Sequence, residues 1–143
     1  MKNTITILFS LVCFYSQSQV EENEVKQRWE VKGSNINGSL LLKLEGSDLY
    51  KLSFKNHLFF DKHIKSIYLS LSDLKISNLY IFLLNSFNLN GSEQNSLKID
   101  KYEFQVSKKA YDLKVDIIMN KSNEIVGRML IKKNDLNNLF GNY

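Results

Sequence analysis

Two histidines and one aspartate form the group of side chains that most resembles a metal-binding site in the sequence. His57, Asp61 and His63 stand close together in the chain, and two imidazoles with a carboxylate can hold zinc while water fills the fourth position. However, a His-x5-His spacing with an intervening aspartate matches no compact zinc-binding pattern, and a loop with two ordinary surface histidines explains it as well. We therefore predict no metal site and no cofactor.

The carboxylate pairs and the serines offer little for catalysis. Glu21 and Glu22 fall in a polar stretch. Asp112 and Asp116 alternate with Lys114 in a strand-like pattern, which is typical of a solvated sheet face. The sequence contains neither a Gly-x-Ser-x-Gly elbow nor a glycine-rich phosphate loop. We predict that the protein is not an enzyme.

The aromatic segment 56–62 is the first candidate for a binding surface. His57, Phe59 and Phe60 could together form an apolar patch, and exposed patches of this kind often mark binding sites. The alternative is that Phe59 and Phe60 tuck under a sheet edge. The sequence leaves these two interpretations open.

One long apolar segment predicts the main helix. Its apolar residues recur with the i, i+3, i+4, i+7 spacing of one helix face. They occupy positions 76, 79, 80, 83, 84 and 87. Ser70 or Ser72 can cap the start and an Asn-Gly pair supplies the stop, so we expect a helix over residues 73–88, too short to span a membrane. Ile81 and Phe82 widen the stripe, which suggests either a concave sheet around the helix or a patch for a partner.

Alternation of apolar and polar residues predicts the strands. Their expected ranges are 28–32, 40–44, 50–55, 65–70, 101–107, 111–119 and 124–132. Residues 91–97 are expected to form a polar loop, and Gly127 inside the last of these strands predicts a bulge. A short terminal helix is expected, capped by Asn134 and ended by Gly141. The predicted fold class is α+β, a single antiparallel sheet of about six strands packed against one main helix, with a short C-terminal helix.

The N-terminal residues have the layout of a secretory signal peptide. Lys2 precedes an apolar run, and Ser16 and Ser18 form a small-x-small cleavage site. We therefore expect a signal peptide over 1–18, a flexible polar leader over 19–27 and a single domain over 28–143. Cys13 is the only cysteine, so the mature chain would have no thiol. Export to the periplasm or the outside of the cell follows, with no transmembrane segment in the mature chain.

The charge balance does not favour a nucleic-acid partner. The chain has 19 basic and 15 acidic residues, a net charge of +4. Its lysines are spread out and alternate with apolar residues, as at Lys43 and Lys51, which on strands predicts that lysine lies on the wet face. Only two arginines are present, although arginine is the preferred residue for phosphate contacts. We therefore predict no binding to nucleic acid.

Several segments resemble small secreted proteins of flavobacteria and related Bacteroidota. The signal ending in YSQSQ, the stretches YKLSFKN and HIKSIYLS followed by a leucine-rich helix, and the closing DLNNLFG carry the resemblance. It implies export and brings no catalytic residues, because those proteins have no assigned function.

Two functional hypotheses follow from these observations. The first is an exported, non-catalytic binding or protein-interaction domain that contacts another envelope protein. The second is a carrier of a small apolar ligand, with a pocket between helix and sheet beneath Leu79, Leu83 and Phe87.

Overall fold

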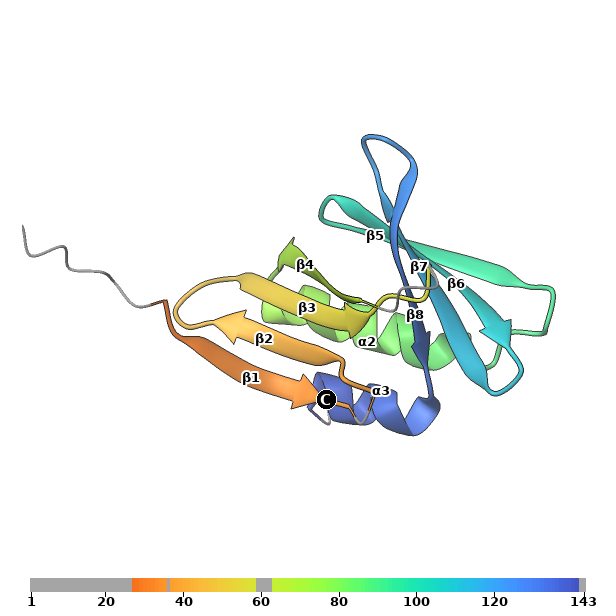
Figure 1. The fold of residues 1–143 in the computed structure, drawn as a ribbon, viewed down its shortest axis with the longest axis horizontal. Helices are drawn as coiled ribbons and strands as arrows, with labels where there is room; N and C mark the ends of the chain where they lie inside the picture. Colours follow the sequence, from red (N-terminus) through yellow and green to blue (C-terminus); the bar gives the residue numbers. More distant parts are fainter. Residues whose placement is uncertain (1–26, 36, 59–62, 142–143) are drawn as a thin grey trace, which may run out of the picture.

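The computed structural model describes residues 27–35, 37–58 and 63–141 (Figure 1). Within these residues, ten elements follow one another. They are β1 (Trp29–Ser34), β2 (Leu40–Leu44), β3 (Leu49–Lys55), β4 (Ile64–Ser70), α2 (Asp73–Ser86), β5 (Gln94–Ile99), β6 (Tyr102–Lys109), β7 (Asp112–Met119), β8 (Glu124–Ile131) and α3 (Lys133–Phe140). The expected signal peptide and nearly all of the expected leader lie outside the described residues.

The strands form two separate antiparallel sheets. The first has the order β1-β2-β3-β4 and the second the order β5-β6-β7-β8, so each is a meander of consecutive strands. The α+β composition is confirmed. The prediction of a single sheet of about six strands packed against one main helix is wrong, because the described strands divide four and four between two sheets, before and after α2 in the chain (Figure 1). The predicted short C-terminal helix is present as α3, which packs against β1 and β2.

The strand β5 was predicted as a loop because its residues give no apolar signal. Gln94, Asn95 and Ser96 are polar and exposed, and only Leu97 and Ile99 turn toward the core. The strand forms because it pairs along its whole length with β6, from Gln94 opposite Ser107 to Ile99 opposite Tyr102. Pairing with a strong neighbour therefore decides its structure, and its own composition does not.

Each helix contacts strands of the sheet that it does not follow in the chain. α2 follows β4 but contacts β5 and β6, and α3 follows β8 but contacts β1 and β2. The helices also meet each other, where the Tyr80 hydroxyl donates to Asn137 Oδ1 at 2.9 Å and the Tyr80 ring lies 5.6 Å from that of Phe140. The two halves of the chain are thus interlocked around one core (Figure 1).

The main helix α2 agrees closely with its prediction. It starts at Asp73 after the N-cap Ser72 and ends two residues earlier than expected. Its predicted inner face is buried at Ile76, Leu79, Tyr80, Leu83 and Phe87, and Leu84 is partly buried.

The terminal helix α3 begins at Lys133 with Lys132 as N-cap, so the predicted cap at Asn134 is wrong. The predicted end at Gly141 is confirmed, since that residue adopts the left-handed conformation with φ 72°.

A local junction joins the two sheets where β3 ends beside β8. The Asn56 side-chain oxygen accepts from the backbone N–H of Arg128 at 2.9 Å, and the backbone N–H of His57 donates to the Arg128 carbonyl at 2.9 Å. The predicted bulge at Gly127 is confirmed by a register shift next to it. A Cβ on Gly127 would come within 2.7 Å of the Phe54 ring, so glycine lets β8 approach β3 at this point.

Candidate functional site

The register of the first sheet places leucines on its outer face. In β3 the side chains of Tyr50, Leu52 and Phe54 are buried. Their cross-strand partners must share that inner face, so Leu41, opposite Leu52, and Lys43, opposite Tyr50, turn inward. Leu40 and Leu42 pair instead with Ser53 and Lys51 on the outer side.

Apolar side chains consequently continue across the outer side of all four strands. Val31, Leu42, Lys51 and Tyr68 form one row across the sheet. Trp29 pairs with Leu44 in the next row. We call this surface the outer apolar face. Its residues are Trp29, Val31, Leu40, Leu42, Leu44, Leu49 and Tyr68.

Solvent reaches this face directly. Val31 is 61% exposed and Tyr68 is 44% exposed, while the leucines between them are half-buried. The Trp29 and Tyr68 rings lie 6.2 Å apart, and Lys51 Nζ lies 5.8 Å from the centre of the Tyr68 ring. A soluble sheet normally presents polar side chains on such a face. An apolar face with two aromatic rings and one cation is typical of an interaction surface.

The inward position of Lys43 corrects the prediction that it lies on a wet face. Its side chain is 18% exposed, and its ammonium reaches Asp73 at 2.5 Å after passing over the Tyr50 ring, 5.5 Å from its centre. The Tyr50 hydroxyl also donates to Asp73. These hydrogen bonds, first that of Lys43 and then that of Tyr50, lower the pKa of Asp73 below its ordinary value. Together they fasten the start of α2 to the first sheet.

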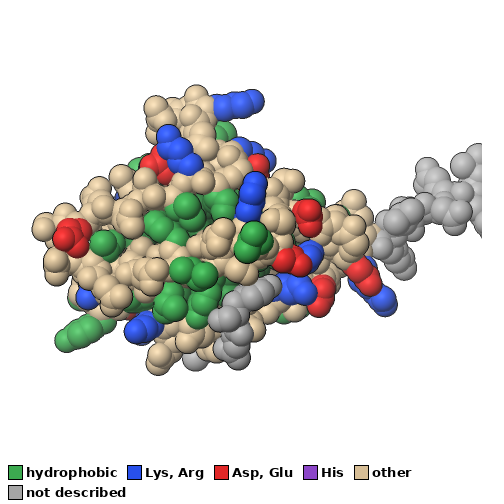
Figure 2. All heavy atoms as spheres, turned by 180° about the vertical axis from the view of Figure 1, so that it is seen from behind, with side chains coloured by type: hydrophobic (Ala, Val, Ile, Leu, Met, Phe, Trp, Pro, Cys, Tyr) green, Lys and Arg blue, Asp and Glu red, His purple; other side chains and the backbone are tan. Residues whose placement is uncertain are grey.

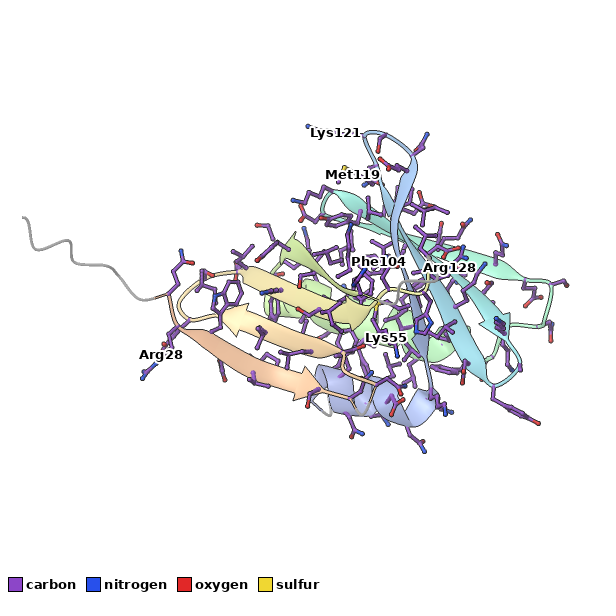
Figure 3. The ribbon with its side chains drawn as sticks, in the orientation of Figure 1. Arg28, Lys55, Phe104, Met119, Lys121 and Arg128 are labelled. Atoms are coloured by element: carbon purple, nitrogen blue, oxygen red, sulfur yellow. The ribbon has the colours of Figure 1, made fainter. Side chains whose placement is uncertain are left out.

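A cleft opens where the outer sides of the two sheets meet. Lys55, at the end of β3, and Arg128, in β8, lie near this junction (Figure 3). One hollow of about 340 Å³ is lined there by Asn37, Lys55, His57, Asp112, Leu130 and Lys132. A second, of about 460 Å³, shares Asp112 and Lys132 and extends along Tyr111 and Lys133. We call the two hollows together the junction cleft.

A partly buried ion pair stands beside the cleft on the second sheet. Asp116 and Arg128 are opposite each other in β7 and β8, and Arg128 binds the carboxylate through Nε at 2.5 Å and Nη2 at 3.1 Å. Lys114 Nζ lies 3.4 Å from the same carboxylate. Hydrogen bonding to Asp116 raises the pKa of Arg128. The predicted solvated position of Asp116 is wrong, because only 7% of its side chain is exposed.

The predicted patch of His57, Phe59 and Phe60 is only partly covered by the structure. His57 is half-buried and lines the junction cleft, whereas Phe59 and Phe60 lie outside the described residues. His63 is exposed, and its carbonyl accepts from the Asn56 backbone N–H at 2.9 Å. Asp61 also lies outside the described residues. Among the side chains that are described, no group of three or more His, Cys, Asp and Glu could hold a metal ion.

The side of the molecule that faces away in Figure 1 has hydrophobic side chains near its centre (Figure 2). On α2 the exposed apolar residues are Leu74 and Ile81, and Phe82 is partly buried against the core. The wide apolar stripe read from the sequence therefore divides between the core and the surface. Within the described residues, neither helix has the length and apolar character needed to span a bilayer.

Comparison of the chain with protein-family models, curated proteins and solved structures gives no match. The resemblance to small secreted proteins of flavobacteria therefore stays a prediction, and the function proposed below depends on the sequence and geometry of this chain alone.

Sequence reasoning missed both surfaces for identifiable reasons. The run Leu40–Leu44 is apolar at every position but one, so its alternation cannot decide which leucines face inward. Which of these leucines face inward is decided only by their pairing with β3, whose alternation is clearer. The cleft joins residues that are distant in the chain, such as Lys55 and Lys132, and no local pattern connects them.

Proposed function

We propose that the protein is an exported, non-catalytic interaction domain that binds a protein partner through its outer apolar face. The observation that carries the proposal is the row Val31, Leu42, Lys51 and Tyr68, which places apolar side chains on the outer side of β1, β2 and β4 and a lysine on β3. Covering such a face removes apolar area from water, at roughly 25 cal/mol per Å².

The aromatic and cationic members of the face suit a protein partner. Trp29 and Tyr68 offer large rigid surfaces at little entropic cost, and residues of these types dominate binding energies at protein interfaces. Lys51 lies between them in the sheet, against the Tyr68 ring, and would favour an acidic or carbonyl-rich contact. Export is part of the proposal because the N-terminal residues resemble a signal peptide.

The packing of α2 does not add support for the alternative of an apolar-ligand carrier. Leu79, Leu83 and Phe87 are buried in the continuous hydrophobic core, and the junction cleft is lined by other residues. We therefore pursue the interaction domain alone.

Site-specific photocrosslinking tests this proposal. Tyr68 is replaced by p-benzoylphenylalanine in the full chain, which is expressed in the organism that encodes it, and Lys121 in the exposed β7–β8 turn is replaced in the same way as the matched control (Figure 3). We expect a discrete protein adduct from position 68 only. An adduct of twice the chain mass would identify a second copy as the partner. No adduct from position 68, or the same adducts from both positions, would contradict the proposal.

A further inference from the structure

The junction cleft gathers positive charge from distant parts of the chain. Lys55 comes from β3, Lys132 from the N-cap of α3 and Lys133 from its first residue. All three line the cleft. Within the described residues, Asp112 is the single acidic residue that lines the two hollows. The cleft therefore has an excess of positive charge at neutral pH, whatever the state of His57.

These lysines are not paired with carboxylates in the described structure. Among the described residues, ion pairs are formed by Lys32, Lys43, Lys98 and Lys114, while Lys55, Lys132 and Lys133 take part in no such contact. Asp112 lies opposite Lys109 in the β6–β7 ladder and lines both hollows. Three ammonium groups around one carboxylate leave charge that a bound anion would neutralise.

The walls of the cleft would strengthen such an interaction. Leu130 lines one hollow and Tyr111 the other. The half-buried Leu130 lowers the local dielectric constant in its hollow, so the attraction of a bound group to Lys55 is greater there than at an open surface, whereas Tyr111 is 89% exposed and adds no such effect. The Lys132 carbonyl accepts from the Leu136 N–H at 3.1 Å, which holds its backbone in place at the start of α3.

We propose that the junction cleft binds an anionic group, a carboxylate or a phosphate, with Lys132 at its centre because it lines both hollows. This site is separate from the outer apolar face. The proposal therefore does not depend on the proposed protein partner.

Titration of the purified protein with inorganic phosphate and with citrate, followed by nitrogen-15 NMR, tests the site. We expect saturable shifts at Asp112, Lys132 and Lys133 that weaken as the salt concentration rises. In Lys132→Gln we expect affinity to fall about tenfold, as for loss of one charge-assisted hydrogen bond. Lys121→Gln removes one lysine from a turn that does not line the cleft and should leave the affinity unchanged.

The spectra also show whether each variant is folded. If Lys132→Gln does not fold, Lys133→Gln serves as the cleft variant in its place. Binding of phosphate without citrate would identify a phosphate site, and the reverse a carboxylate site. The proposal is overturned if neither anion binds, if the shifts lie elsewhere, or if Lys121→Gln weakens binding as much as the cleft variants.

Discussion

The replacement Gly33→Ala tests the interlocking of α3 with the first sheet. A Cβ at this position would lie 2.2 Å from the carbonyl oxygen of Leu139 and 2.3 Å from that of Asn138. Both are backbone atoms of the last turn of α3, so no side-chain rotation can relieve the contact. The helix end cannot easily shift, because a Cβ on Gly141 would itself meet the Lys32 carbonyl oxygen at 2.4 Å.

The size of the effect follows from this geometry. The helix end must retreat by about 1 Å to restore an ordinary contact, and overpacking of a tight site costs about 1–3 kcal/mol, sometimes more. Because the opposing atoms belong to the backbone, we expect Gly33→Ala to lose about 3 kcal/mol of unfolding free energy. At roughly 4 °C per kcal/mol for a domain of this size, Tm should fall by about 12 °C.

The assay is urea unfolding of the purified protein, followed by circular dichroism, with Gly91→Ala as the matched control. At Gly91 an added Cβ meets nothing within 4 Å, so the change should be neutral or slightly stabilising through its effect on the unfolded chain. If the two variants unfold within about 0.5 kcal/mol of each other, a difference near the scatter of ordinary surface substitutions, then α3 does not press against β1 as described.

Three further substitutions test other contacts. Arg128→Met leaves the buried Asp116 carboxylate with Lys114 alone and should lower the unfolding free energy by about 2 kcal/mol, as measured by urea unfolding, whereas an unchanged midpoint would contradict the pairing. Gly127→Ala should also destabilise by about 1–3 kcal/mol because its Cβ would strike the Phe54 ring, and a stable, unshifted variant would show that β8 does not approach β3 so closely. The pKa of Asp73 is lowered in the folded state, so its contribution to stability is full above the ordinary value of 3.8 and is lost as pH falls through the lowered value. Asp73→Asn should therefore lower the unfolding free energy at neutral pH. In acid, the difference in unfolding free energy between the variant and the parent protein should become smaller. A difference independent of pH would refute the assigned hydrogen bonds.

Local patterns in the sequence predict most elements but not how they assemble. The spacing of Ile76, Leu79 and Leu83 predicts α2 and its buried face, because a helix is specified by contacts within one segment. The local sequence does not predict β5, because its polar residues form a strand only by pairing with β6. The division into two sheets also depends on contacts distant in the chain, such as that between Asn56 and Arg128.

The candidate site was predictable only in small part. His57 was singled out and does line a cleft, but the leucines of the outer apolar face read as core residues until cross-strand register assigns their side. Tyr111 shows a similar error, because it continues the apolar alternation of β7 yet lies in the preceding turn, 89% exposed. Alternation gives the direction of side chains within a strand and cannot tell where the strand begins.

The most direct test of the interaction surface is the Tyr68 photocrosslink measured with and without Val31→Lys. Val31 belongs to the same row of the outer apolar face and is largely exposed, so the charge should not unfold the domain. Glu124→Lys, at an exposed position at the start of β8, adds a lysine away from this face and is the control. We predict that Val31→Lys abolishes the adduct while Glu124→Lys preserves it. An adduct that survives Val31→Lys unchanged would show that the outer apolar face is not where the partner binds.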